Sequence, residues 1–166
     1  MFEFDEIIDV VDVDNNIIRQ APRYEVHNKR LMHRSVHILV FNSQGNLFLQ
    51  KRSMVKDENP GLWDTSAAGH VNSGESYLHC AERELGEELG IKETLDEAMF
   101  IPAQINTFWE HIRVYTCVTN KKIIISPIEI SKGIYWSLSR IKQTIVSNPE
   151  IFTSSFMLIF NSHVSE

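Results

Sequence analysis

The stretch that decides the fold spans residues 69–91 and reads GHVNSGESYLHCAERELGEELGI. Its second half predicts a helix over residues 76–89, because apolar residues recur there at helical spacing and Gly90 supplies a C-terminal cap. The predicted apolar stripe consists of Leu78, Ala81, Leu85 and Leu89. We expect this stripe to pack on a sheet, with Cys80 as a small core residue beside it.

Three glutamates share a neighbouring face of the same helix. A helix turns by about 100° per residue, so Glu84, Glu87 and Glu88 project from one side. A run of glutamates on a helix is by itself usually a solvated face. Three carboxylates this close repel one another unless a cation compensates, and hard oxygen ligands favour Mg²⁺ or Mn²⁺.

The spacing around these glutamates is highly specific. Five residues separate Gly69 from Glu75, and seven separate Glu75 from Arg83. The positions that define the pattern are Gly69, Glu75, Arg83, Glu84, Leu85, Glu87, Glu88, Gly90 and Ile91. At ordinary residue usage, a window matches all of these positions by chance with a probability on the order of 10⁻⁹. The pattern is identified as the Nudix box, and the chain therefore resembles a Nudix hydrolase.

The resemblance implies a fold and a reaction. The implied fold is α/β (α+β), a single domain over residues 1–166 in which an α/β/α sandwich surrounds a central mixed sheet and the box helix covers residues 76–89. The implied reaction is cleavage of a diphosphate linkage in a nucleoside diphosphate derivative or a related organic pyrophosphate. A metal ion that contacts the phosphates offsets charge and lowers the pKa of bound water.

Roles for individual residues follow from their positions in the box. The implied ligands of Mg²⁺, or of Mn²⁺ in its place, are Glu84, Glu87, Glu88 and the Gly69 carbonyl. Glu75 and Arg83 would pair and hold the loop against the helix. A spare glutamate can take the proton of the attacking water, and Glu87 or Glu88 is the residue implied for this role.

Residues outside the box resemble type I isopentenyl-diphosphate isomerases, which share the Nudix fold. Basic residues precede Pro60-Gly61-Leu62-Trp63, as the diphosphate-contacting residues do in those enzymes, and Gly69-His70 matches a metal-binding Gly-His. The substrate-binding residues that this resemblance implies are Lys51, Arg52, Lys56, His70 and His33. His27 lies one residue away from a further ligand position, so a second metal at His27, His33 and His70 stays an open alternative.

Two groups that the isomerase reaction needs are absent. Ala68 stands where those enzymes have a catalytic cysteine before Gly-His, and Ile112 replaces the second glutamate of a Glu-x-Glu segment. Neither side chain can transfer a proton. We therefore predict a hydrolase of the isomerase-like branch, with isopentenyl-diphosphate isomerase as the first alternative. A non-catalytic nucleotide-binding Nudix domain is the second alternative, which the intact box disfavours.

Structural roles also account for several of these residues. His33 and His37 lie four apart on a predicted strand and share a face, where hydrogen-bonded histidines are commoner than metal ligands. A solvated hairpin edge or core packing would explain the remaining basic and aromatic residues, namely Lys51, Arg52, Lys56, Trp63, Phe108 and Trp109.

The rest of the chain alternates between predicted strands and helices, which indicates a layered α/β fold. Strands are predicted at 7–13, 17–20, 37–41, 47–50, 100–109, 112–119 and 133–136, and helices from Pro22 toward Arg30 and over 138–147 and 152–161. Residues 53–61 read as a loop.

Composition restricts the class of protein. The 166 residues carry 22 acidic and 16 basic side chains, a net charge of −6, and residues 69–91 alone hold a net charge of −4. This concentrates the negative charge at the predicted cation site and disfavours a duplex nucleic-acid partner. A small-molecule diphosphate is the predicted partner, and a homodimer is compatible with this size.

Location is inferred from the cysteines and from the chain ends. Two cysteines, Cys80 and Cys117, exclude a disulfide scaffold and favour a reducing compartment. The acidic residues 1–6 do not resemble a secretory signal, and the apolar run 156–160 is too short to span a membrane. We expect a cytoplasmic protein without membrane contact.

Overall fold

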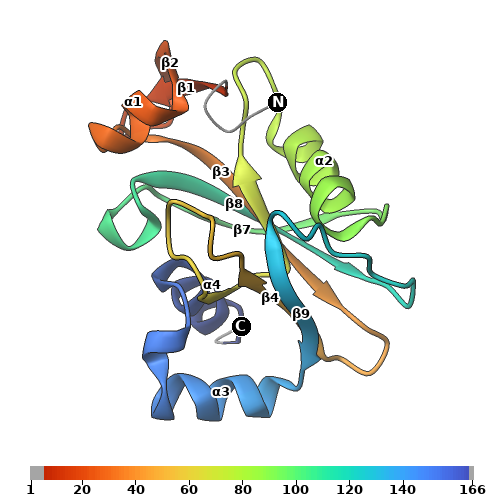
Figure 1. Cartoon of the computed structure of the whole chain (residues 1–166). Coiled ribbons are helices and arrows are strands. Elements are labelled where there is room, and N and C mark those ends of the chain that lie inside the picture. The colour runs from red at the N-terminus through yellow and green to blue at the C-terminus, as the bar shows by residue number, and fades with distance from the viewer. Residues whose placement is uncertain (1–5, 165–166) are drawn as a thin grey trace.

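A seven-stranded mixed sheet forms the centre of the computed structural model, which describes residues 6–164 (Figure 1). The strands are β1 Ile7–Val11, β2 Ile17–Pro22, β3 His33–Phe41, β4 Leu47–Arg52, β5 Trp63–Asp64, β6 Ala67–His70, β7 Asp96–Ile101, β8 Glu110–Val118 and β9 Ile130–Trp136. The helices are α1 Arg23–Asn28, α2 Tyr77–Leu89, α3 Leu138–Ser147 and α4 Ser154–Val164, with 3-10 turns η2 Ile105–Thr107 and η3 Pro149–Ile151. Residues 1–5, which include most of the acidic N-terminus, lie outside the described residues.

The sheet is split between β3 and β4. These strands form a hairpin but pair only at Phe41 and Leu47, next to the turn. Beyond that point β3 pairs in parallel with β8 and antiparallel with β6, whereas β4 pairs with β5 and β9. The two halves of the sheet therefore diverge from the hairpin, and the space between them is available for a ligand.

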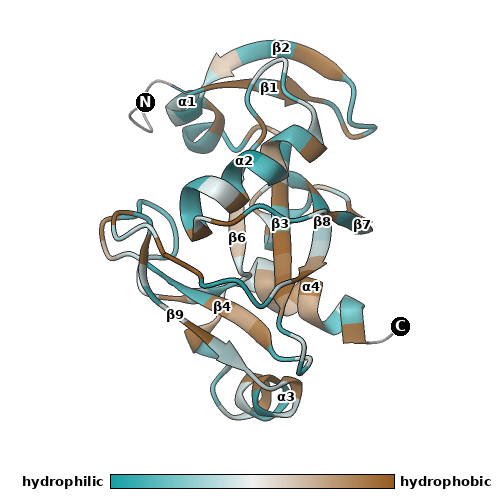
Figure 2. Ribbon diagram, turned by 90° about the vertical axis from the view of Figure 1, so that its right-hand side faces the viewer, coloured by the Kyte–Doolittle hydropathy of each residue, from teal (hydrophilic) through white to brown (hydrophobic). Residues whose placement is uncertain are grey.

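Helices cover both faces of the sheet, which confirms the predicted α/β/α sandwich (Figures 1 and 2). Successive side chains of β3 point to opposite faces of the sheet and pack in the cores on the two sides. On one face Val36, Ile38 and Val40 pack in a core with the α2 residues Ala81, Leu85 and Leu89. On the other face Leu39 shares a core with Ile112, Val114, Phe156, Ile159 and Phe160. The β1–β2 hairpin and α1 form a separate small layer beside this sandwich.

The box helix forms where the sequence predicts it. The Ser76 hydroxyl caps its first turn by accepting a hydrogen bond from the His79 N–H at 3.1 Å. Gly90 ends it in a left-handed conformation at φ 67°, which a residue without Cβ adopts at little cost. Cys80 is buried as predicted, but the prediction for Leu78 is wrong: its side chain is 44% exposed. Leu78 lies two residues before Cys80, the first buried residue of the helix, so solvent reaches it at the helix start.

The strand predicted for 100–109 is wrong in its second half. The ladder of β7 ends at Ile101 because Pro102 follows and has no N–H to donate. The chain then makes the 3-10 turn η2, and Phe108 and Trp109 adopt positive φ values of 54° and 63° before β8 begins. The last strand also starts earlier than expected, at Ile130 rather than Gly133.

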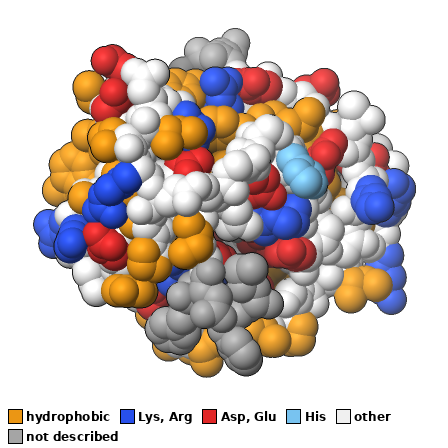
Figure 3. Space-filling view, turned by 90° about the horizontal axis from the view of Figure 1, so that it is seen from above, with side chains coloured by type: hydrophobic (Ala, Val, Ile, Leu, Met, Phe, Trp, Pro, Cys, Tyr) orange, Lys and Arg blue, Asp and Glu red, His pale blue; other side chains and the backbone are white. Residues whose placement is uncertain are grey.

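Charge on the surface is mixed on the face that Figure 3 shows. Acidic and basic side chains are interspersed there among hydrophobic ones, and the basic residues do not gather into one region (Figure 3). Within residues 6–164 the helices are too short, or too polar, to cross a bilayer.

Candidate functional site

A cleft of about 780 Å³ opens where the two halves of the sheet diverge. This volume lies within the range of pockets that take small molecules. Eight acidic side chains line it, namely Glu6, Glu58, Asp64, Glu84, Glu87, Glu88, Glu110 and Glu129. Four basic side chains face them, namely Arg23, Arg52, Lys56 and Arg83. Acidic side chains outnumber lysines and arginines two to one in this lining, so a bound cation would favour binding of an anionic ligand.

The three glutamates predicted to bind metal all line this cleft. Glu88 accepts hydrogen bonds from the Gln50 side chain at 2.7 Å and from the Ala68 N–H at 3.3 Å. Glu84 accepts one from Arg83 Nη1 at 2.7 Å. The Glu87 side chain is 61% exposed and accepts a hydrogen bond from Arg83 Nη1 at 3.3 Å. Glu84 and Glu88 are therefore held in place, while Glu87 can move.

Arg83 and Glu75 form the pair predicted from the box. Arg83 donates from Nε to Glu75 Oε1 at 2.8 Å and from Nη2 to Oε2 at 3.0 Å, a bidentate geometry. Glu75 also accepts from the Asn72 N–H, and Arg83 donates to the His70 carbonyl. The pair thus fastens the 71–75 loop and the end of β6 to α2.

Gly69 is required by the position of Glu84. A Cβ atom at residue 69 would lie 2.1 Å from Glu84 Oε1 and 2.2 Å from its Cδ, far inside van der Waals contact. The Glu84 carboxylate therefore rests directly on the backbone of β6. This contact places the carboxylate against residue 69, whose carbonyl the box pattern predicts as a further ligand.

The pKa values of Glu84 and Glu88 are raised, which favours their neutral forms. Burial raises the pKa of Glu84 to about 7, although the Arg83 charge opposes the shift. Burial and then the neighbouring Glu84 charge raise the pKa of Glu88 well above its usual range. Buried carboxylates that hold protons at neutral pH are stabilised as anions by a bound cation. The donor set, three carboxylates that line one cleft, fits Mg²⁺ or Mn²⁺.

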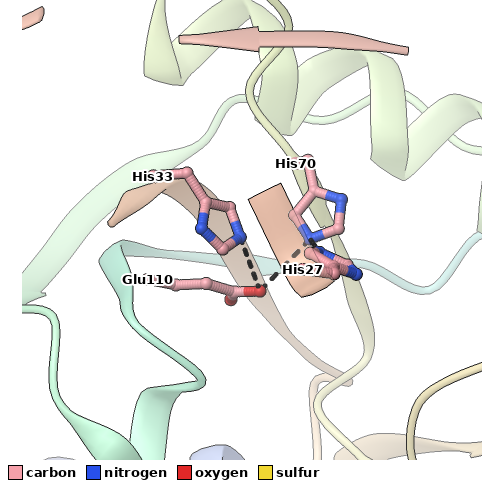
Figure 4. A group of neighbouring side chains, drawn as sticks. All are labelled: His27, His33, His70 and Glu110. Carbon is pink, nitrogen blue, oxygen red and sulfur yellow. Dashed lines mark hydrogen bonds and ion pairs between the residues drawn. The ribbon is translucent and has the colours of Figure 1, made fainter. Parts of the chain in front are cut away.

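A second group of polar side chains converges beside the box. His27 from α1, His33 from β3, His70 from β6 and Glu110 from β8 point toward one another (Figure 4), and their ligand atoms all lie within 4.8 Å. Glu110 Oε1 lies 3.2 Å from His70 Nε2 and 3.4 Å from His33 Nε2. His27 Nε2 and His70 Nε2 are 3.3 Å apart.

The outer nitrogen of each histidine in this cluster also has a neighbour. His33 Nδ1 contacts the Leu31 carbonyl at 2.8 Å, His27 Nδ1 lies 3.3 Å from Glu58, and His70 Nδ1 lies 3.6 Å from Glu6. Of these three contacts, only that of His33 is a hydrogen bond of good geometry, and such an outer partner orients a histidine toward a metal. Among the described residues, His33 Nε2 is buried without a hydrogen bond of good geometry. This orphaned nitrogen, with two further imidazoles and one carboxylate, fits a divalent transition metal.

The charge of the metal-free cluster agrees with this assignment. Burial lowers the pKa of His27 to about 3, so that ring is neutral and can act as a ligand. Burial also opposes protonation of His70, but the hydrogen bond with Glu110 and the nearby Glu6 carboxylate outweigh it and raise its pKa to about 10. In the absence of metal, one proton on His70 therefore provides the positive charge that Glu110 requires.

The predicted substrate-binding residues divide into two groups. Arg52, Lys56 and His70 line the cleft. His33 lies in the histidine cluster rather than in the cleft lining, and Lys51 is also outside the lining, paired with Lys132 and Trp63 in the sheet. Arg52 donates to the Glu58 carbonyl at 3.0 Å, and Lys56 forms an ion pair with Glu129. Both cations are therefore held in position before any ligand binds.

Among the predicted aromatic residues, Trp63 packs against Trp136 with ring centroids 5.2 Å apart, whereas Phe108 stands at the rim of the cleft. Sequence reasoning missed Gln50, Glu6 and Glu58, whose partners lie far away in the chain. Glu110 could have been recognised, because it is the first glutamate of the Glu-x-Glu position in the isomerase resemblance.

Known proteins resemble this chain in sequence and in structure. The family model of the NUDIX domain matches residues 31–139. The isopentenyl-diphosphate Delta-isomerase 2 of Photorhabdus laumondii is 33% identical over 163 residues, which cover 95% of this chain and 92% of that protein. An uncharacterized Nudix hydrolase of Pseudomonas aeruginosa is 35% identical over 131 residues, 77% of this chain and 76% of its own. The crystal structure of a Deinococcus radiodurans protein matches with a TM-score of 0.86 and 24% identity, over 95% of this chain and 99% of that one.

Proposed function

The chain belongs to the Nudix domain family of pyrophosphate hydrolases, and from this premise we propose that it cleaves a diphosphate linkage in an organic diphosphate with the help of Mg²⁺. In this reaction water adds to one phosphorus, the bond from that phosphorus to the bridging oxygen breaks, and two phosphate products leave. The observation that carries the proposal is that Glu84, Glu87 and Glu88 open together into a cleft with twice as many acids as bases.

The residues of this chain have separable tasks in that reaction. When bound, Mg²⁺ would offset phosphate charge and lower the pKa of a water molecule. Glu84 and Glu88 would hold the ion, because both carboxylates are fixed by hydrogen bonds. Glu87 would be the general base, since its carboxylate is 61% exposed and can release a proton to solvent. Arg52 and Lys56 would face the diphosphate.

The reaction can be tested directly on the whole protein. Purified protein with Mg²⁺ is expected to convert members of a panel that includes ADP-ribose, UDP-glucose and isopentenyl diphosphate into the two phosphate products of each, separated by chromatography. Omission of divalent metal should abolish turnover. Lack of any turnover with both Mg²⁺ and Mn²⁺ would refute the proposal.

Isomerisation of isopentenyl diphosphate is a second candidate function, because full-length relatives carry that name and the histidine cluster is present. Ala68 and Ile112 argue against it. Ile112 has no exposed surface and packs in an apolar core, so the position offers no proton donor or acceptor. We expect no allylic isomer in the NMR spectrum of isopentenyl diphosphate incubated with the protein and metal; its appearance would reverse this assignment.

We further propose that the histidine cluster binds one transition-metal ion. Metal analysis of the purified protein is expected to find about one equivalent of a transition metal per chain, and a chelator should lower the melting temperature. The His33→Ala variant should lose this metal, because the substitution removes one of the four ligands of the cluster. His79→Ala serves as the control, since His79 is exposed at the start of α2. Equal metal content in wild type and His33→Ala would contradict the assignment.

We also propose where the protein is located and what it binds. The Cys80 and Cys117 thiols are both free and buried, which supports a reducing, cytoplasmic environment. The proposed partner is a small-molecule diphosphate rather than a nucleic-acid duplex, and a homodimer remains compatible with the size of the chain.

A further inference from the structure

The loop of residues 53–61 joins β4 to β5 and forms part of the rim of the cleft. It therefore belongs to the half of the sheet that holds β4, β5 and β9. Helix α1 is attached to the other half, because the Val11 N–H in its layer donates to the Met32 carbonyl, directly before β3, at 2.9 Å. A contact between α1 and the loop consequently joins the two halves of the sheet at the rim of the cleft.

Arg23 of α1 and Asp57 of the loop make such a contact. Arg23 donates from Nη1 to Asp57 Oδ2 at 2.9 Å and from Nη2 to Oδ1 at 3.0 Å, which is a bidentate ion pair. The side chain of Arg23 is 9% exposed and that of Asp57 is 51% exposed. Exposed ion pairs usually contribute little to stability, but a bidentate pair on a buried arginine is held in one geometry. The pair therefore fixes where the loop lies relative to α1.

A second contact joins the same two segments. His27 follows Arg23 by four positions and shares its face of α1, and His27 Nδ1 lies 3.3 Å from Glu58 Oε1. Arg23 Nε also faces Glu6 at 3.7 Å, so all three nitrogens of the guanidinium face carboxylates. Arg23 lines the cleft, but its charge is already directed at these acidic groups. This arrangement suits Arg23 to hold the loop rather than to contact a phosphate.

Asp57 stands between two residues that place the cations of the cleft. Lys56 precedes it, and the Lys56 ammonium forms an ion pair with Glu129 in the cleft lining. Glu58 follows it, and the Glu58 carbonyl accepts a hydrogen bond from Arg52 Nε at 3.0 Å. A shift of Asp57 would therefore move both the backbone that carries Lys56 and the carbonyl that holds Arg52. Small displacements of groups that position a substrate can cost large factors in rate.

The remaining attachments of the loop lie at its ends. Backbone hydrogen bonds of Ser53 and Gly61 fasten the two ends to their own half of the sheet. At the tip, the side chains of Met54 and Val55 are 72% and 78% exposed. The middle of the loop reaches the other half of the sheet through Asp57, so the position of its centre depends on this residue.

We propose that Asp57 is a positioning residue, whose ion pair with Arg23 holds the 53–61 loop against α1. The loop in turn places Lys56 and Arg52 where they face the diphosphate. This inference rests on the proposed hydrolysis, in which these two cations bind the substrate. Because they would contact the phosphates in the ground state and in the transition state alike, loss of the ion pair should raise KM with little change in kcat.

Hydrogen exchange tests the ion pair independently of activity. Asp57→Asn keeps the size of the side chain and removes its charge, so the backbone amides of residues 53–61 are expected to exchange faster than in the wild type. Asp14→Asn is the matched control, because Asp14 is exposed between β1 and β2 and the substitution removes the same charge. Equal exchange of the loop in Asp57→Asn and in the wild type would overturn the proposal.

Kinetics with the member of the diphosphate panel that the wild type hydrolyses fastest test the effect on the site. In Asp57→Asn, KM is expected to rise by about 10-fold while kcat stays within about 2-fold. A purely structural role would lower the amount of folded protein, and with it kcat, without raising KM. Asp57→Glu keeps the carboxylate and should recover part of the loss, since the half-exposed side chain leaves room for one more methylene. An unchanged KM in Asp57→Asn would contradict the positioning role.

A double-mutant cycle shows whether Asp57 acts through Arg23. Arg23→Gln should raise KM at least as much as Asp57→Asn does, and the double variant should have the same KM as Arg23→Gln alone. Effects on KM that multiply would refute an action through Arg23. Melting curves identify variants that do not fold. Absence of turnover in the wild type would refute the proposed hydrolysis, whereas hydrogen exchange would still decide whether the ion pair holds the loop.

Discussion

Glu88→Gln is expected to lower the rate of Mg²⁺-dependent diphosphate hydrolysis by at least about 100-fold, because even the outer partners of metal ligands cost about 10–100-fold when they are removed. The substitution keeps the size of the side chain but removes the negative charge. The fold should tolerate it. Glu88 is buried, and burial already raises its pKa well above the usual range, so a neutral side chain suits the metal-free interior.

The measurement therefore has two parts with opposite expectations. Steady-state hydrolysis should collapse, while the melting temperature without metal should stay the same or rise, and addition of Mg²⁺ should no longer raise it. Glu82→Gln removes a charge from an exposed position of the same helix and should change neither property. Full activity in Glu88→Gln would exclude Glu88 from the metal site.

The box was predictable because its chemistry is local. One helical period fixes which glutamates share a face, and the Ser76 and Gly90 caps fix where the helix begins and ends. The sequence also predicted in part which side of the sheet the basic residues of β4 face. Lys51 and Arg52 are adjacent on β4, and adjacent strand residues face opposite sides. Only one of them could line the cleft, and the structure shows that it is Arg52.

The outer contacts of the site could not be predicted, because they join segments that are distant in sequence. Glu6 reaches His70 across 64 positions, and Gln50 reaches Glu88 across 38. Neither residue has a local pattern that marks it. The turn at 102–109 differs in kind, since Pro102 was visible in the sequence and should have ended the predicted strand. The apolar pattern of residues 100–109 does not reveal that Pro102 lacks the backbone N–H that a strand would need.

Gly69→Ala is expected to reduce hydrolysis by at least about 100-fold, since the added methyl group must displace the Glu84 carboxylate that lies 2.1 Å from its position. Glu84 cannot move freely. Arg83 holds it at 2.7 Å, and Glu75 in turn holds Arg83. The added atom should also destabilise the protein by about 1–3 kcal/mol, the usual cost of overpacking a filled interior. Activity, Mg²⁺ affinity and the free energy of unfolding should therefore all fall.

Gly86→Ala makes the same chemical change seventeen positions later in the box and should have the opposite effect on stability. A Cβ atom at Gly86 meets nothing within 4 Å, and the residue lies inside α2, where alanine is favoured over glycine by about 0.5–1 kcal/mol. The free energy of unfolding should rise and hydrolysis should persist. The two variants are compared by chemical denaturation and by steady-state rates. The comparison shows whether the box is sensitive to any added atom or only to the contact between residue 69 and the Glu84 carboxylate. If Gly69→Ala keeps its activity while Gly86→Ala loses it, the carboxylate of Glu84 does not ligate the catalytic metal, and the site must be rebuilt around Glu87 and Glu88.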